Sequence, residues 1–455
     1  MTYPEALAFW YARINYEVRA AEPGDLKLER MRALLRRVGD PHDRVRLVHV
    51  TGTKGKGSTS AMLAAVLRAA GYRIGLFTSP HLTDVRERVQ VDGEPISEAE
   101  LAARMAELAP AVAAMDADGF PPPTFFEIGT ALGFLHFAYR RCDLAVVEVG
   151  LGGRFDSTNV CRPLVSVVTS VGLDHTAQLG GTVEAIAFQK AGIIKRHVPV
   201  VSGVTEPAPR DVVRAIAAEM SAPLWERGRD FDGDYRPGAA DRLPEVAVTT
   251  PRGGNGPFAL KLIGEHQAHN AALAVATADR LGECGLTIPL AAVAGGLRAV
   301  CWPGRVEVVA RHPAVILDTA HNVPSAEALV KTLAESFPAA RRKAVVLAVS
   351  SDKPVADILR VLAGYFDHFH LTRYGINPRC VPPADAATLL AAVAPAVDCI
   401  VHPTAATAWA AAREAAGPDD LVCVTGSVFL AGELLPHVRA AADLSGSGVK
   451  SEPRC

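Results

Sequence analysis

Residues 48–62, VHVTGTKGKGSTSAM, combine glycines, lysines and hydroxyl side chains at a spacing suited to holding phosphate. The usual phosphate loop follows G-x-x-x-x-G-K-[ST], but here Val50 stands at the first glycine position and Gly57 separates Lys56 from Ser58. In such a loop backbone N–H groups point at an anion, Lys56 can reach its oxygens, and Ser58 can offer a hydroxyl to Mg²⁺. We predict a phosphate cradle. The alternative is a tight turn with a solvated lysine.

Two further side chains stand where an open α/β sheet binds its ligands. Glu148 ends the apolar run LAVVEV, and His175 follows LVSVVTSVGLD. Both are therefore expected at the carboxyl ends of parallel strands, where a carboxylate can hold Mg²⁺. The alternative for Glu148 is a salt bridge at the strand end. The alternatives for His175 are a helix cap and a position in the core.

The elements that must position these residues alternate between short apolar runs and helical patterns, which indicates βαβ units with a parallel sheet. Residues 206–257 show no regular pattern, and we predict an irregular region there with a small β element, or β excursion, or a loop. The predicted strands are 46–51, 73–78, 144–150, 164–171 and 198–203, and the predicted helices are 58–71 and 269–283.

The alternation restarts after CWPGR, at residues 301–305. We therefore predict an α/β fold with a mostly parallel-sheet ATPase domain containing the phosphate loop, over residues 1–300, and a smaller Rossmann-like α/β domain over 301–442. The polar tail, residues 443–455, is expected to be disordered.

The composition argues against several classes of partner and site. Apolar residues make up 49% of the chain, charged residues 21%, and the net charge is −2, so nothing favours nucleic acid or anionic membrane as a partner. The N-terminus does not resemble a signal peptide, and no run reaches the ~18 apolar residues of a membrane span. The eight cysteines lack C-x-x-C spacing, which argues against a disulfide framework and against a cysteine zinc site. A cytoplasmic location is expected.

An ordered set of motifs resembles the folylpolyglutamate synthase/dihydrofolate synthase family of Mur-ligase-type, ATP-dependent amide ligases. No single motif is specific, but their order along the chain is. They are GTKGKGS (52–58), TSPHL (78–82), ERV (87–89), DLAVVEVGLGGRFDSTN (143–159), GLDHTAQLGGT (172–182), KAGI (190–193), GEHQAHNA (264–271), WPGR (302–305), DTAHN (318–322) and GS (426–427).

The resemblance implies ATP as a substrate and one or two Mg²⁺ ions. Ser58, Glu148 and His175 match its metal ligands, and Lys190 matches a lysine that is carbamylated in the family and so supplies a carboxylate near the metal. The alternative for Lys190 is an ordinary salt-bridged lysine in a helix. Lys56, His175, Lys190 and His321 are the implied catalytic positions. The implied nucleotide contacts are Gly52, Thr53, Gly55, Lys56, Gly57, Ser58, Thr59, Asn270, Arg305, Asp318 and His321.

The resemblance also implies a pteroate-binding region. It would include the segment 78–89, Asp156 and PTFFE (123–127). A helix-start acid is an equally good interpretation of Glu127. The implied substrate-binding residues are Ser79, Pro80, His81, Arg88, Glu127 and Asp156.

The chain also departs from the family pattern. Gln189 stands where a glutamate usually precedes Lys190, DTAHNVPSA replaces the commoner D-G-A-H-N-P, and Phe155 and Ser157 flank Asp156. These differences leave open which pteroate substrate fits best.

The implied reaction joins L-glutamate to dihydropteroate, to the γ-carboxyl of folate, or to both, through an acyl phosphate made from ATP. Closure of the second domain would exclude water from that intermediate. The alternatives are a P-loop NTPase or kinase-like phosphotransferase, another Mur-type ligase, or a non-catalytic binding protein. The chain has no Asn-Lys pair for a guanine motif, and 51 residues before Gly52 are too few for a UDP-binding domain. A monomer acting on small molecules is expected.

Overall fold

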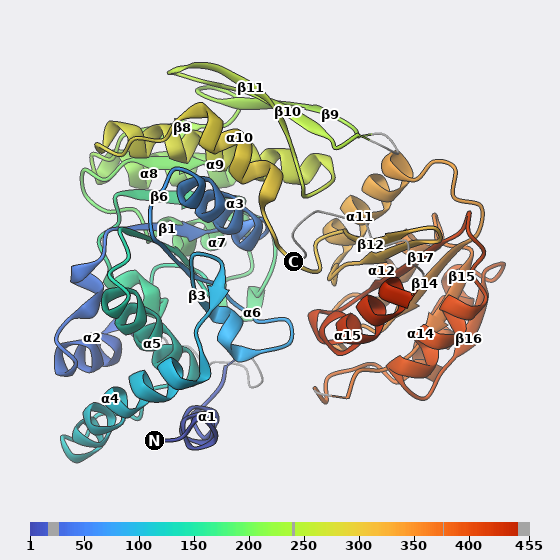
Figure 1. Ribbon diagram of the computed structural model, residues 1–455, viewed down its shortest axis with the longest axis horizontal. Helices are drawn as coiled ribbons and strands as arrows, with labels where there is room; N and C mark the ends of the chain where they lie inside the picture. The colour runs from blue at the N-terminus through green and yellow to red at the C-terminus, as the bar shows by residue number, and fades with distance from the viewer. Residues whose placement is uncertain (17–26, 239–241, 376, 445–455) are drawn as a thin grey trace. The chain divides into compact units, whose positions relative to one another are not determined.

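The computed structural model describes residues 1–16, 27–238, 242–375 and 377–444, and these form two compact units (Figure 1). Unit 1 takes its described residues from 1–234, 246–259 and 267–300. Unit 2 takes its described residues from 235–245, 260–266 and from 301 onward.

Unit 1 is built on an eight-stranded sheet in the order β4-β3-β2-β5-β1-β6-β7-β8. The six strands from β2 to β8 in that order pair in parallel, whereas β3 and β4 are antiparallel. Every residue of β1, β5 and β6 is buried, as expected of parallel strands covered on both faces. The strands are β1 (Leu47–Thr51), β2 (Ile74–Phe77), β3 (Val89–Val91), β4 (Glu94–Pro95), β5 (Leu144–Glu148), β6 (Val165–Val168), β7 (Val200–Ser202) and β8 (Leu224–Glu226).

Helices flank the strands of the eight-stranded sheet (Figure 1). One apolar core of unit 1 joins α1, α2, α4 and α5, where the rings of Trp10 and Phe125 stack with centroids 5.0 Å apart. The helices up to residue 300 are α1 (Tyr3–Tyr11), α2 (Leu28–Arg37), α3 (Lys56–Ala69), α4 (Glu98–Ala117), α5 (Phe125–Tyr139), α6 (Thr176–Leu179), α7 (Val183–Ala191), α8 (Pro207–Glu219), α9 (Glu265–Glu283) and α10 (Leu290–Ala299), with the 3₁₀ turns η1 (Pro41–Arg44), η2 (Val85–Arg88) and η3 (Ser157–Val160).

The predicted strands of unit 1 are confirmed within a few residues, but the irregular region predicted at 206–257 is wrong in its first part. Helix α8 and strand β8 occupy that part. Pro207 and Pro209 both lie in the first turn of α8, where no backbone N–H has an intrahelical partner, so they are compatible with the helix. The β excursion is confirmed as a three-stranded sheet of β9 (Asp232–Arg236), β10 (Glu245–Thr250) and β11 (Gly253–Ala259).

Unit 2 carries a six-stranded sheet in the order β12-β13-β17-β14-β15-β16, parallel except for β12. Its strands are β12 (Glu307–Arg311), β13 (Ala314–Leu317), β14 (Lys343–Leu347), β15 (His368–Leu371), β16 (Asp398–Val401) and β17 (Leu421–Thr425). Its helices are α11 (Val323–Ser336), α12 (Val355–Ala363), α13 (Pro383–Val393), α14 (Ala405–Glu414) and α15 (Val428–Leu444).

The predicted fold class is confirmed: a large, mostly parallel sheet carries the glycine-rich loop, and a smaller α/β unit follows. Of the predicted tail, residues 443 and 444 are the last of α15, and 445–455 lie outside the described residues. None of the described helices combines the length and the apolar character needed to cross a membrane.

Candidate active site

The glycine-rich loop connects β1 to α3, as the sequence predicts. Gly55 is the N-cap residue of α3 with a φ of 81°, and a Cβ there would lie 2.2 Å from the Asn270 side-chain oxygen. At Gly52 a Cβ would lie 1.9 Å from Thr169 Oγ1. Both positions therefore require glycine, one for its left-handed backbone and both for close approach. The result is a turn that presents the N-terminus of α3.

Residues that follow β6 hold this loop in place. Thr169 and Ser170 donate hydrogen bonds from their hydroxyls to the Lys54 carbonyl, at 2.5 and 3.0 Å. The backbone N–H groups of Thr53 and Lys54 bond Ser170 in return, at 2.8 and 2.9 Å. The Lys54 ammonium forms an ion pair with Asp174, with nitrogen and oxygen 3.0 Å apart. The loop is thus clamped to a neighbouring strand end, and Lys54 takes part in that clamp.

Two lysines converge on one carbonyl of the loop. Lys56 Nζ donates to the Gly52 oxygen at 3.1 Å, and Lys190 Nζ from α7 donates to the same oxygen at 2.9 Å. Burial, followed by the nearby Lys56 charge, lowers the pKa of Lys190 to about 7. Lys190 is therefore partly a neutral amine near neutral pH. The Lys56 ammonium and the protonated fraction of Lys190 lie close to a helix N-terminus and favour an anion there.

The predicted metal ligands lie around the same strand ends. The Glu148 carboxylate, 3% exposed at the end of β5, accepts a hydrogen bond from the Ser79 N–H at 3.2 Å. Gly57 and Ser58 occupy the first turn of α3, where Ser58 is buried, and Thr59 follows, fully buried. A carboxylate and a hydroxyl are oxygen ligands suited to Mg²⁺.

His175 stands at the N-cap position of α6 with a φ of 51°, but its side chain makes no capping hydrogen bond. The imidazole is about half exposed, and its Nε2 lies 3.9 Å from the Asp174 carboxylate. No group of three or more His, Cys, Asp and Glu side chains that could hold a metal occurs within residues 1–16, 27–238, 242–375 and 377–444. A set made of Ser58, Glu148 and His175 contains only two such residues, so its role in binding Mg²⁺ stays a prediction.

Asn270 joins the loop from α9. Its side chain is 8% exposed; it donates to Gln267 Oε1 at 3.0 Å, while Thr59 Oγ1 lies 3.5 Å from its own oxygen. The sequence interpretation missed Gln267, as well as Thr169, Ser170 and Asp174. The last three stand in the stretch that links β6 to His175, so polar residues just beyond an apolar run were the available signal.

Asp156 orders the loop that follows β5. One carboxylate oxygen accepts from the N–H groups of Gly150 and Leu151 at 3.1 and 3.0 Å, and the other accepts from the N–H of Thr158 at 2.9 Å. Burial raises its pKa, and these hydrogen bonds oppose that shift. The carboxylate therefore shapes the loop backbone, and its predicted contact with pteroate stays a prediction.

Glu127 makes the contacts of the helix-start alternative. It accepts from the Thr124 N–H and hydroxyl at 2.8 and 2.9 Å, which forms a capping box at α5, and from Arg30 Nε at 2.6 Å. One buried oxygen therefore accepts all three bonds, which favours a structural role over a substrate contact.

The segment at 78–89 approaches Glu148 through Ser79, while Pro80 is exposed. Arg88 is 1% exposed, donates from Nε to His81 Nδ1 at 2.9 Å, and lies 5.2 Å from the Phe125 ring centroid. The guanidinium thus fixes the His81 ring within this segment.

In unit 2 the three predicted residues meet at the end of β13. The Asp318 carboxylate accepts from the N–H groups of Val306 and Ala320 at 3.0 and 2.6 Å, and burial raises its pKa. Arg305 donates to the hydroxyl of Thr319, and the Thr319 carbonyl lies 2.9 Å from His321 Nδ1. Because a carbonyl only accepts, Nδ1 carries a proton, and Nε2 holds the lone pair in the neutral ring.

The comparisons with known proteins agree with one another on the family. Residues 50–278 match the Mur ligase middle domain, and 304–428 match the Mur ligase glutamate ligase domain. The chain is 39% identical, over 82% of its length and 85% of the relative, to a dihydrofolate synthase/folylpolyglutamate synthase of Bacillus subtilis.

Two solved structures share the fold and the sequence family. One is a Mycobacterium tuberculosis folylpolyglutamate synthase complexed with ADP, with a TM-score of 0.87 and 33% identity over 96% of this chain and 98% of that one. The other is E. coli FolC in complex with DHPP and ADP, with a TM-score of 0.84 and 30% identity over 97% and 98%. The chain belongs to the folylpolyglutamate synthase/dihydrofolate synthase family of Mur ligases, whose members are ATP-dependent ligases.

Proposed function

We propose that this protein joins L-glutamate to dihydropteroate and to the γ-carboxyl of folates, at the expense of ATP. The observation that carries the proposal is the glycine-rich loop, where Lys56 and Lys190 converge on one carbonyl beside a helix N-terminus. The family supports the reaction class, and the double name of the Bacillus subtilis relative supports both activities.

The chemistry follows from the weakness of a carboxylate as an electrophile. Transfer of the γ-phosphoryl group to the acceptor carboxylate gives an acyl phosphate and ADP. The amine of L-glutamate then attacks the acyl carbon, the amide C–N bond forms, and the C–O bond to phosphate breaks. Phosphoryl transfer needs positioning and charge neutralisation, which the loop N–H groups and Lys56 supply.

We propose that Ser58, Glu148 and His175 hold Mg²⁺. Their oxygen and nitrogen donors fit the ion, and Glu148 and Ser58 are both buried at the edge where phosphate would lie. The ion would neutralise charge on the phosphates.

We also propose that Lys190 is carbamylated. Its amine is buried, and its pKa of about 7 leaves a nucleophilic neutral fraction. The nitrogen lone pair attacks CO₂, an N–C bond forms, and one N–H proton passes to solvent. Incubation with ¹³C-bicarbonate should give a carbamate carbon resonance that the Lys190→Met variant lacks. A spectrum without that difference would reject the modification.

The ligation assay is ADP release measured with each substrate omitted in turn. Release should depend on ATP, on L-glutamate and on a dihydropteroate or tetrahydrofolate acceptor, and the product should gain one glutamate by mass spectrometry. ADP release that needs neither acceptor nor glutamate would instead favour an NTPase. Activity on only one acceptor would restrict the proposal to that reaction.

The monomeric state and the cytoplasmic location remain predictions. Light scattering behind size-exclusion chromatography tests the first, with one chain of 48.0 kDa as the expected mass.

A further inference from the structure

Strand β1 carries an imidazole into the core of unit 1. His49 is fully buried, and its Nδ1 has no hydrogen-bond partner among the described residues. Burial lowers the pKa of His49 to about 3, so the ring is neutral at neutral pH. A buried polar atom without a partner costs free energy, and an apolar residue would avoid that cost. The position therefore indicates a role for the other ring nitrogen.

His49, Thr158 and Asp156 form a relay of hydrogen bonds. His49 Nε2 lies 2.8 Å from Thr158 Oγ1, and the Thr158 hydroxyl donates to one oxygen of the Asp156 carboxylate. Because a hydroxyl has a single proton, Thr158 Oγ1 accepts from His49, and the proton of the neutral ring is on Nε2. Thr158 is fully buried and Asp156 is 5% exposed, so the relay runs through the interior of unit 1.

The relay ends on the loop that follows β5. The second oxygen of its carboxylate accepts from the N–H groups of Gly150 and Leu151 at 3.1 and 3.0 Å. Thr51, at the end of β1, donates from its hydroxyl to the Gly152 carbonyl at 2.7 Å. Strand β1 therefore holds this loop at two points, once directly and once through the relay.

The same loop packs against the end of helix α7 that carries Lys190. The Arg154 N–H donates to the Gln189 carbonyl at 2.7 Å, and a Cβ at Gly153 would lie 2.8 Å from the Lys190 carbonyl oxygen. At its other end the loop begins two residues after Glu148. It therefore joins a predicted metal ligand to the lysine that contacts the glycine-rich loop, and a shift of its backbone would move one relative to the other.

We propose that His49 and Thr158 are positioning residues for ligation. With Asp156 they fix the loop at 150–154 and, through it, the relative positions of the predicted metal ligand on β5 and the lysine on α7. The inference rests on the proposed function. Both side chains act through other residues, because each is fully buried.

The first test is Thr158→Val, which removes the hydroxyl and keeps the branched shape. Assays at saturating ATP, L-glutamate and acceptor give kcat, which is then corrected for the folded fraction. We expect kcat per folded molecule to fall about fivefold, the worth of one buried hydrogen bond, with each KM within about twofold of the wild type. Thr158→Ser keeps a hydroxyl and should restore kcat.

Two results of this test would overturn the proposal. One is an unchanged kcat with a lower melting temperature, which is the result of a purely structural role. The other is a rise in the KM for the acceptor with an unchanged kcat, which is expected if the Asp156 carboxylate contacts pteroate directly.

Thr130→Val is the matched control. Thr130 on α5 is buried like Thr158, and its Oγ1 lies 2.7 Å from the hydroxyl of Ser157, the residue before Thr158. The same substitution therefore removes the same kind of contact to the same segment, while the three residues of the relay stay as they are. Its kcat per folded molecule should equal that of the wild type. An equal loss in both threonine variants would overturn a specific role for the relay.

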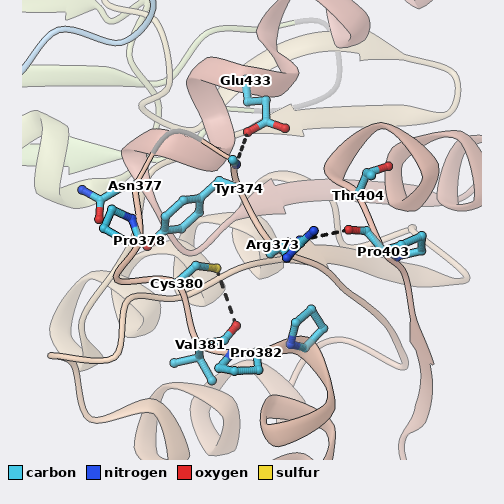
Figure 2. Close-up of a pocket in the computed structure, with 12 residues that line it drawn as sticks. Arg373, Tyr374, Asn377, Pro378, Cys380, Val381, Pro382, Pro403, Thr404 and Glu433 are labelled. Atoms are coloured by element: carbon cyan, nitrogen blue, oxygen red, sulfur yellow. Dashed lines mark hydrogen bonds between the residues drawn. The ribbon is translucent and has the colours of Figure 1, made fainter.

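A second control lies in unit 2. Tyr374 lines a cavity of about 470 Å³ (Figure 2), and its buried hydroxyl lies 2.6 Å from Ser350 Oγ. Tyr374→Phe deletes this hydrogen bond between two hydroxyls and should leave kcat per folded molecule unchanged. A loss as large as that of Thr158→Val would mean that kcat depends on any buried hydrogen bond, which would overturn the proposal.

His49→Leu separates positioning from stability, and it keeps the proposal testable if Thr158→Val does not fold. The substitution removes the Nε2–H donor together with the unpartnered Nδ1, so the melting temperature should not fall. We expect kcat per folded molecule to fall about twofold to threefold, because the Thr158 hydroxyl loses its donor but keeps its bond to Asp156. A wild-type kcat would overturn the role of His49.

A double-mutant cycle tests the route through Thr158. In a Thr158→Val background, His49→Leu should leave kcat unchanged, because His49 acts only through that hydroxyl. A full repeat of its loss would overturn the route. An inactive wild-type enzyme would overturn both this inference and the ligase function, whereas an active wild type beside unaffected variants rejects the relay alone.

Discussion

The strand-end clusters of the two units handle charge in opposite ways. In unit 1 the side-chain nitrogens of Lys56 and Lys190 share one neutral acceptor, the Gly52 carbonyl. In unit 2 the Asp318 carboxylate accepts from two backbone N–H groups and from Thr425. Positive charge at the first cluster would stabilise a bound anion. The Asp318 carboxylate, by contrast, already accepts hydrogen bonds from donors of its own chain. Removal of the Lys56 charge should therefore affect activity chiefly, whereas substitution of Asp318 should affect stability chiefly.

The largest expected effect is that of Lys56→Ala. Removal of a charge that stabilises the transferring phosphoryl group should lower kcat by at least about 100-fold, with little change in melting temperature. Lys54→Ala is the control, because Lys54 belongs to the same loop but pairs with Asp174. Steady-state kinetics at saturating ATP compares the two. A small loss for Lys56→Ala would remove it from the mechanism and weaken the contrast between the units.

Asp318→Asn should act mainly on stability. The substitution replaces an acceptor oxygen by an NH₂ group that faces backbone donors, which costs about 2–3 kcal/mol in unfolding free energy. Denaturant unfolding followed by circular dichroism gives this value. A variant as stable as the wild type would mean that the carboxylate is not needed to hold the turn at Val306.

The depressed pKa of Lys190 predicts a pH dependence of stability. The folded protein loses this proton near pH 7, and the unfolded chain keeps it until about 10.5, so the unfolded state binds more protons between these values. Stability of the wild type relative to Lys190→Met should therefore rise with pH above 7, by roughly 1 kcal/mol per pH unit. The measurement is denaturant unfolding at pH 7, 8 and 9 in CO₂-free buffer. A flat difference would show that Lys190 titrates normally.

The smallest effect is expected for Glu127→Gln. Loss of the Arg30 ion pair and weakening of the capping box should lower the unfolding free energy by about 1 kcal/mol. The KM for the pteroate acceptor should not change if Glu127 is structural, as its contacts indicate. A clear rise in that KM, with normal stability, would restore the substrate-binding interpretation.

Much of the fold could be predicted because periodicity and punctuation are local signals. The apolar runs around β1, β5 and β6 and the glycine-rich turn before α3 are each specified within a few residues. The helix at Pro207–Glu219 was missed for a local reason too, since proline usually signals a break but is tolerated in the first turn.

The sequence by itself determined the fold class, the phosphate-type loop and the family, because ordered motifs and strand-helix alternation need no knowledge of distant contacts. Only the tertiary structure decided what each polar side chain touches. It paired Lys54 with Asp174, brought Lys190 to the Gly52 carbonyl, and gave Glu127 the partner Arg30. Each of these pairs joins positions far apart in the chain, so burial and charge at the site follow from packing, which local sequence does not encode.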